Sequence, residues 1–257
     1  MLYAAGQINC TNNIKTNIDN IKKLIDYGSA VGADWCITPE YALTGHVDNM
    51  DDWVDPKPSI EEIVTYAKDK NVGLFLGTLY ESEEPDKVYN QIRVYDKDGS
   101  FIKAANKIRC WGSIEKFEYS SEGIENNVIK LPNGEKVGIL VCNDLWGNGW
   151  DEGPNIPRTM VGYYGAGFFI HCTNATRDTP SVRDSCLREY HSAWIRATGL
   201  DEHIISVDNA CNMNGTPYTG PTSSQSGAVF KGEWVRKASE RGVDYFHVRL
   251  GGPYKTE

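Results

Sequence analysis

The sequence has no long hydrophobic run, which bears on the class of protein it encodes. No stretch of the 257 residues reaches the roughly 18 to 20 uninterrupted apolar residues that a membrane-spanning helix needs. The opening MLYAAGQIN carries no positive charge and enters strand-like sequence at once, unlike a signal peptide. We therefore expect a protein that does not insert into a membrane.

Paired cysteines and basic runs are missing as well. The seven cysteines form no C-x-x-C pair, which argues against a disulfide framework or a zinc site. The net charge of −9, with no offsetting basic run, argues against nonspecific nucleic-acid binding. No phosphate-cradling loop or metal-ligand cluster is present. We expect a cytoplasmic protein that uses no metal or cofactor and binds no nucleic acid.

Apolar periodicity and turn residues indicate a mixture of helices and strands. Hydrophobic residues make up 40% and charged residues 24%, as in ordinary globular proteins. Two hairpins are expected around Asp98-Gly99 and Asn133-Gly134, and Ser59 with Glu62 predicts a capping box at a helix start. Helical spacing covers 14–25, 60–67, 157–164 and 185–198, while strand patterns cover 2–8, 34–38, 72–79, 89–95, 101–105, 128–131, 136–141, 167–172 and 203–207, with short strands to residue 250.

The order of these elements predicts the fold class. Helices alternate with strands in the first half, and hairpins are interleaved with them. This order favours an α/β fold with mixed sheets, layered as helix, sheet, sheet and helix. No linker, low-complexity stretch or internal repeat marks a boundary, so we expect a single domain over residues 1–257.

Three segments far apart in the sequence each end an expected strand on a side chain with catalytic chemistry. Glu40 follows the strand at 34–38, Lys107 follows the first hairpin, and Cys142 follows an apolar run. The carboxyl end of a strand is where α/β proteins place their sites. Each residue alone is more often structural or solvated, because free cysteine is usually buried and charged residues usually lie at the surface.

Together these groups are the parts needed to cleave a carbon–nitrogen bond through a thioester. A desolvated Glu40 would take the thiol proton and later activate water. Lys107 beside the thiol would favour the thiolate and stabilise the oxyanion that forms on the attacked carbon. Cys142 would be the nucleophile. The combination predicts a thiol-dependent hydrolase.

The chain resembles members of the nitrilase, or carbon–nitrogen hydrolase, superfamily over nearly its whole length. The resemblance rests on Pro39-Glu40, Asn106-Lys107 and Val141-Cys142, with supporting matches at Gln7, Gly45, Gly77, Tyr89-Asn90 and Pro157-Arg158. It implies a single-domain four-layer α-β-β-α sandwich. It also implies that Glu40 is the general base, Cys142 the nucleophile, and Lys107 an oxyanion stabiliser aided by the Asn143 N–H. A homodimer or larger assembly is implied too.

A second glutamate is suggested by the same resemblance. In amidase-type members a segment after the lysine carries a tryptophan and a further glutamate, and here Trp111 and Glu115 are in register. Such a carboxylate would hold the Lys107 ammonium in place and help orient the substrate amide. We favour Glu115 for this role, with Glu118 as the competitor, and either one can instead be a solvated loop residue.

The residues around the nucleophile bear on the substrate. Nitrilases proper usually place tryptophan and glutamate directly after the cysteine, whereas Asn143 and Asp144 follow it here. This difference favours amides over nitriles. Tyr41, Trp111 and Trp146 are candidates for the wall of a substrate pocket, although aromatic residues more often belong to the core.

The expected function is therefore that of a cofactor-free amidohydrolase acting on a small amide or N-carbamoyl compound. A nitrile hydrolase with the same three residues, and a non-catalytic relative that kept the fold, are the alternatives. His171 and His191 invite a cysteine–histidine mechanism of the papain kind, but no cysteine has the flanking sequence that mechanism requires. The serine-rich stretch at 220–227 is explained by turn chemistry.

Overall fold

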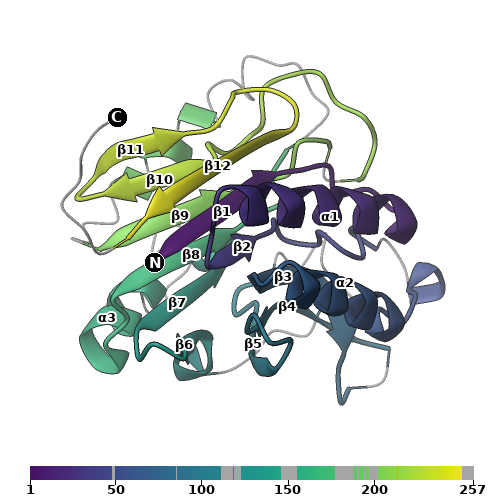
Figure 1. Ribbon diagram of the computed structural model, residues 1–257, viewed down its shortest axis with the longest axis horizontal. Coiled ribbons are helices and arrows are strands. Elements are labelled where there is room, and N and C mark those ends of the chain that lie inside the picture. The colour runs from purple at the N-terminus through teal and green to yellow at the C-terminus, as the bar shows by residue number, and fades with distance from the viewer. Residues whose placement is uncertain are drawn as a thin grey trace.

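Two six-stranded β-sheets lie face to face at the centre of the described part of the chain (Figure 1). The structure is a computed structural model that describes residues 1–47, 50–84, 86–110, 118, 123–145, 155–176, 188–189, 191–193, 195–196, 202–212 and 214–250. Helices pack on the outer faces of both sheets, so the layers run helix, sheet, sheet, helix. The α/β four-layer fold expected from the sequence is confirmed.

The first sheet joins the start of the chain to residues 244–249, more than 200 positions later. Its order is β12-β1-β2-β3-β4-β5. Strands β1, β2 and β3 are parallel, whereas β4, β5 and β12 pair in antiparallel fashion. The bounds are β1 Leu2–Gln7, β2 Trp35–Ile37, β3 Gly73–Glu81, β4 Val88–Tyr95, β5 Phe101–Asn106 and β12 Asp244–Arg249.

The second sheet has the order β11-β10-β9-β8-β7-β6. Its three central strands, β7, β8 and β9, are parallel, so their carboxyl ends lie at one edge of the sheet. The bounds are β6 Val128–Lys130, β7 Lys136–Val141, β8 Phe168–Cys172, β9 His203–Val207, β10 Gly227–Phe230 and β11 Glu233–Lys237.

Helices α1 and α2 lie side by side over the first sheet, and α3 covers the second sheet on the opposite side of the molecule (Figure 1). α1 (Ile14–Ala30) begins at Asn13, whose side chain accepts a hydrogen bond from a backbone N–H of the first turn. α3 spans Ile156–Tyr164, and the described residues between 188 and 196 are also helical. Short 3-10 helices are η1 (Met50–Asp52), η2 (Ile124–Asn127) and η3 (Cys142–Leu145).

The capping box predicted for the second helix is wrong. α2 spans Lys57–Asp69, so Ser59 lies inside the helix and caps nothing. The helix begins two residues earlier, after Pro56, with Asp55 accepting a hydrogen bond from the Lys57 N–H at 3.0 Å. Pro58 fits this first turn because a proline needs no N–H partner there.

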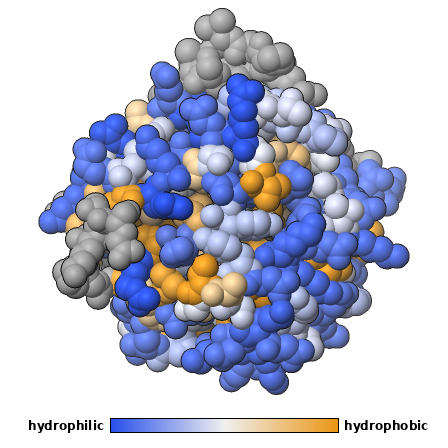
Figure 2. Space-filling model, turned by 45° about the horizontal axis from the view of Figure 1, so that its top comes forward, coloured by the Kyte–Doolittle hydropathy of each residue, from blue (hydrophilic) through white to orange (hydrophobic). Residues whose placement is uncertain are grey.

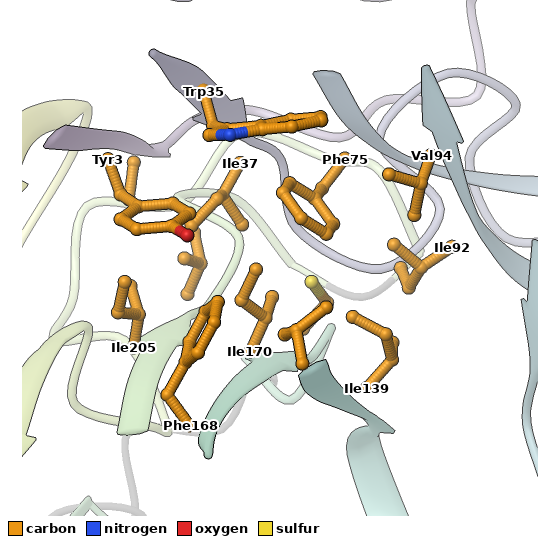
Figure 3. Packing of buried hydrophobic residues seen from close by; sticks show 14 of the residues in the cluster. Tyr3, Trp35, Ile37, Phe75, Ile92, Val94, Ile139, Phe168, Ile170 and Ile205 are labelled. Carbon is orange, nitrogen blue, oxygen red and sulfur yellow. The ribbon is translucent and has the colours of Figure 1, made fainter. Parts of the chain in front are cut away.

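The main core lies between the sheets. Figure 3 shows side chains of the first sheet, among them Trp35 and Phe75, facing Phe168 and Ile170 of the second. All four side chains are at most 5% exposed. Truncation of such a buried aromatic side chain to alanine costs about 3–5 kcal/mol. This packing therefore holds the two sheets at a fixed spacing, which matters because both sheets contribute to the site below.

The face of the molecule drawn in Figure 2 is mainly hydrophilic, with hydrophobic residues in patches among polar ones. The large hydrophobic side chains exposed in the described part of the chain are Val54, Phe101, Tyr163, Val235 and Val243. Within the described residues, no helix has the length and apolar character that crossing a bilayer requires.

Candidate active site

Glu40 lies in a tight turn directly after β2 and is only 1% exposed. The turn is held against β3 because Thr38 donates its N–H to the Phe75 carbonyl and accepts the Gly77 N–H at 2.8 Å. Gly77 is required here, since a Cβ atom built on it would lie 1.9 Å from the Pro39 carbonyl oxygen. The glutamate is therefore positioned by close approach of the neighbouring strand.

Lys107 follows β5 and forms a fully buried ion pair with Glu40. Its Nζ lies 2.8 Å from Glu40 Oε1, and the two side chains are 0% and 1% exposed. The Lys107 backbone N–H donates to the Asn90 carbonyl at 2.8 Å, which extends the pairing of β5 with β4 by one residue. A buried ion pair of this kind persists only where further hydrogen bonds satisfy the charges.

Those further hydrogen bonds come from Asn90 and Asn174. Asn90 Nδ2 donates to Glu40 Oε1 at 2.7 Å, and the Asn174 backbone N–H donates to Glu40 Oε2 at 2.8 Å. Both oxygens of the carboxylate thus accept hydrogen bonds, Oε1 from Lys107 and Asn90 and Oε2 from the Asn174 N–H. Asn174 follows β8 of the second sheet, so this bond ties the glutamate of one sheet to the other.

A second glutamate lies beside the first. Asn90 Nδ2 also donates to Glu118 Oε2 at 3.0 Å, and the Tyr41 hydroxyl donates to Glu118 Oε1. Glu118 is 9% exposed and Tyr41 is 2% exposed. Asn90 therefore bridges the carboxylates of Glu40 and Glu118. Glu115, Trp111 and Trp146, for which the sequence predicts roles in the site, lie outside the described residues.

Cys142 is the first residue after β7 and the first residue of η3. Its backbone φ of +48° is unusual for a residue other than glycine. Its side chain is half-buried, and Sγ lies 3.9 Å from the Oδ1 of Asn143, which is half-buried too. The strand end and the left-handed backbone together place this thiol at the edge where β7, β8 and β9 end.

Asp144 connects the lysine loop to the cysteine loop. Its carboxylate accepts hydrogen bonds from the backbone N–H groups of Ile108 (3.0 Å), Arg109 (2.8 Å) and Val141 (3.1 Å). Burial raises the pKa of Asp144 to about 7, against the opposing effect of these hydrogen bonds and of Lys107. This one side chain therefore links the backbone after Lys107 to the loop of Cys142.

His171 lies within β8, as the sequence predicts, and its imidazole contacts the backbone carbonyl of Cys142. Its Nε2 lies 3.1 Å from the Cys142 carbonyl oxygen, and its Nδ1 lies 2.9 Å from Ser206 Oγ. Burial lowers the pKa of His171 to about 4, helped by Lys107 and opposed by the hydrogen bond to Cys142. The imidazole is therefore neutral near pH 7, and it contacts the cysteine at the main chain.

The loop that carries Asn174 is held by a buried aspartate. Asp208 accepts hydrogen bonds from the N–H groups of Ala175 and Ser224, both at 2.9 Å, and from the Thr176 hydroxyl at 3.2 Å. Burial raises the pKa of Asp208 to about 7, and the surrounding donors oppose this shift. Asp208 thereby fixes the loop whose Asn174 N–H reaches the glutamate.

The described residues thus bring a carboxylate, an ammonium and a thiol to the edge where both sheets end. Glu40 and Lys107 come from the first sheet, and Cys142 comes from the second. Among the residues described, no group of three or more histidine, cysteine, aspartate or glutamate side chains is placed to hold a metal ion. The arrangement offers a base, an electrostatic stabiliser and a nucleophile.

Comparison with known proteins agrees with this chemistry. A family model described as carbon-nitrogen hydrolase matches residues 2–229. The chain belongs to this family. It is a hydrolase of carbon–nitrogen bonds.

This carbon–nitrogen hydrolase is similar in fold to solved structures of an amidase from Nesterenkonia sp. AN1. A variant with acrylamide added at the active-site cysteine superposes with a TM-score of 0.76 and 17% identity, covering 98% of this chain and 93% of that one. A variant in complex with butyramide gives a TM-score of 0.73 and 18% identity, with 96% and 90% covered.

A curated relative is the 2-oxoglutaramate amidase of Bacillus subtilis (strain 168). The two sequences are 28% identical over 116 residues, which is 44% of each chain. The match therefore spans less than half the length of this curated relative.

Several groups that surround the site of this hydrolase are not assigned to it from the sequence. The Asn174 N–H is a backbone donor, and the Asp144 carboxylate accepts hydrogen bonds from backbone N–H groups. A sequence pattern does not indicate which loop a backbone hydrogen bond reaches. The resemblance favours Glu115 over its competitor Glu118, because it places Glu115 in register with the second glutamate of amidase-type members. The isolated bridge that pairs Glu118 with Val88 explains its placement, since it lays Glu118 beside β4 and Asn90.

Proposed function

We propose that this hydrolase cleaves the carbon–nitrogen bond of a small amide or N-carbamoyl compound through a thioester on Cys142. The observation that carries the proposal is the buried pair of Glu40 and Lys107, 2.8 Å apart, at the edge where β7 ends on the cysteine. A buried carboxylate at this edge is in a position to serve as the general base for the thiol.

The reaction begins when Glu40 takes the proton of the Cys142 thiol. The thiolate attacks the carbonyl carbon, a carbon–sulfur bond forms, and the carbonyl oxygen becomes an oxyanion. The Lys107 ammonium and the Asn143 N–H stabilise this charge. The carbon–nitrogen bond then breaks, and ammonia leaves with the proton that Glu40 returns.

Water completes the cycle. Glu40 takes a proton from water, the hydroxide attacks the thioester, and the carbon–sulfur bond breaks to release the acid and the Cys142 thiol. We assign Glu118 the role of the second glutamate. Its sharing of Asn90 with Glu40 supports this assignment, because a carboxylate there can accept a hydrogen bond from the substrate amide N–H₂ and hold Asn90 in place.

An ammonia-release screen tests the proposal. The panel contains simple carboxamides such as butyramide, the ω-amide 2-oxoglutaramate, N-carbamoyl amino acids and aliphatic nitriles, with Cys142→Ala as the blank. We expect release from at least one amide or carbamoyl compound, and hydroxylamine should divert the acyl group of the thioester to a hydroxamate. Release that survives in Cys142→Ala, or turnover of nitriles alone, would overturn the proposal.

The predicted homodimer or larger assembly stays a prediction, which light scattering of the purified protein checks.

A further inference from the structure

The peptide between Cys142 and Asn143 has to be held in one orientation if the proposed function is right. Its N–H is the backbone donor assigned to the oxyanion, and its C=O belongs to the nucleophile itself. This peptide is trans, as are all those described. The C=O and N–H of a trans peptide point in opposite directions in one plane. Whatever fixes the carbonyl therefore also aims the N–H.

His171 contacts this carbonyl from the side of the second sheet. The distance from Nε2 to the Cys142 oxygen is 3.1 Å, and a carbonyl oxygen can only accept, so Nε2 carries the hydrogen. In a neutral imidazole Nδ1 is then an acceptor, and it receives the Ser206 hydroxyl at 2.9 Å. Ser206 thus selects the tautomer that His171 needs.

Strand register fixes the position of this pair. His171 of β8 lies directly opposite Ser206 of β9 and opposite Leu140 of β7. Leu140 belongs to the apolar cluster under α3, together with Phe169. His171 and Ser206 are 1% and 0% exposed, so two polar side chains replace apolar ones on a buried face. Burial of polar groups costs free energy unless they are hydrogen-bonded, which favours a use beyond packing.

The position of the peptide in η3 agrees with this use. Asn143 is the second residue of the 3-10 helix, so its N–H has no partner within that helix and is open to an acceptor in the site. The carbonyl of Cys142 has two lone pairs and can accept from His171 alongside the bonds of the 3-10 turn. The backbone φ of +48° at Cys142 requires such support, because a left-handed non-glycine residue is strained.

We propose that His171, oriented by Ser206, is a positioning residue that holds the Cys142 carbonyl and thereby aims the Asn143 N–H at the oxyanion. This inference rests on the proposed function. It makes His171 act on the stabilisation of the tetrahedral intermediate, and it leaves the formation of the thiolate to Glu40 and Lys107.

Two reactions of the same thiol separate this role from a merely structural one. Amide hydrolysis forms an oxyanion. Alkylation by iodoacetamide does not, because the sulfur displaces iodide from a saturated carbon as the carbon–sulfur bond forms. The experiment measures kcat and KM for the amide found in the screen, and the rate of Cys142 alkylation by intact-protein mass spectrometry, with Cys142→Ala identifying adducts on other cysteines.

The variants are His171→Leu, which removes the donor, His171→Gln, whose amide can replace Nε2–H, and Ser206→Ala, which removes the group that selects the tautomer. We expect His171→Leu to lower kcat by about 10-fold or more with little change in KM, since loss of an oxyanion donor costs about 10²–10³ in kcat. Its alkylation rate should stay within about twofold of wild type. His171→Gln should recover much of kcat, and Ser206→Ala should fall between them.

The failures are distinguishable. A wild-type protein that releases ammonia from no compound of the panel overturns the proposed function and, with it, this inference. An active wild type with unchanged kcat in His171→Leu overturns the inference alone. The inference is also overturned if hydrolysis and alkylation fall together in His171→Leu and His171→Gln recovers neither, because the histidine would then only support the fold.

Discussion

Gly77→Ala tests how strictly the position of Glu40 depends on the strand beside it. A Cβ atom at residue 77 would lie 1.9 Å from the Pro39 carbonyl oxygen and 3.1 Å from Glu40 Cα. Real Cβ atoms essentially never show contacts under 3.0 Å, so the oxygen has to move from 1.9 Å to at least 3.0 Å, about 1.1 Å. Pro39 directly precedes Glu40, so we expect the carboxylate to move with it.

A displacement of this size should affect catalysis more than stability. Misplacement of a catalytic group by about 1 Å can lower the rate by about 100-fold, and we expect kcat/KM for the amide substrate to fall by that order. Overpacking costs about 1–3 kcal/mol, so the variant should still fold. Gly162→Ala is the matched control. A Cβ atom at Gly162 in α3 meets nothing within 4 Å, and alanine there should stabilise the helix by up to about 1 kcal/mol without changing kcat/KM.

The assay is ammonia release over a range of amide concentrations, with urea unfolding of both variants in parallel. If Gly77→Ala folded cooperatively and kept a wild-type kcat/KM, the reasoning that Gly77 positions Glu40 would be refuted. If Gly77→Ala lost both activity and cooperative unfolding, the glycine would instead be required for packing of the sheet.

Three further predictions concern the buried titratable groups. Lys107→Met leaves the Glu40 carboxylate without its counter-ion, and the free energy of unfolding should fall by about 3–5 kcal/mol in urea titrations. Glu40→Gln in that background should restore part of the loss, and no restoration would contradict the ion pair. Asp208→Asn places an amide N–H₂ among groups that all donate, so it should cost about 1–3 kcal/mol of stability. It should also lower kcat, because it loosens the loop whose Asn174 N–H reaches Glu40. A wild-type kcat in this variant would count against that coupling. The pKa of His171 is lowered from 6.5 to about 4 in the folded protein. The unfolded state therefore binds the proton at higher pH, and the contribution of neutral His171 to the free energy of unfolding is lost as pH falls from about 6.5 toward 4. The His171→Gln variant has no group that titrates here, so its free energy of unfolding relative to wild type should improve over this range by at most about 3 kcal/mol. Urea midpoints of the two proteins that change in parallel at all pH values would argue against this prediction.

Much of the fold was predictable because the signals are local. Apolar periodicity places the strands within a residue or two of their observed ends, and glycines at φ +85° (Gly99) and +90° (Gly134) form the two hairpin turns. The capping box failed because a local motif at Ser59 was overridden by the prolines that precede and follow the start of α2.

The site was only partly predictable for a related reason. Each of the three principal side chains lies shortly after the end of a strand, and that position can be recognised from the chain alone. The residues that hold them act across loops from different sheets, as Asn174 does for Glu40 and Asp144 for Lys107. Such bonds depend on how the sheets pack together, and no sequence spacing records that. The contacts of Glu118 with Asn90 and Val88 of β4 are likewise long-range, and no spacing in the sequence records them.

The pairing of β1 with β12 has a consequence for how the protein is made. The sheet that carries Glu40 and Lys107 is completed by residues 244–249, which leave the ribosome long after the other strands of that sheet. Until then the outer edge of β1 has unpaired backbone groups, and the Gln7 side chain lacks the Ser239 and Gly242 carbonyls to which it donates at 3.0 and 2.8 Å. A nascent chain stalled before residue 244 should therefore be inactive and prone to aggregation, because the sheet that carries Glu40 and Lys107 still lacks β12.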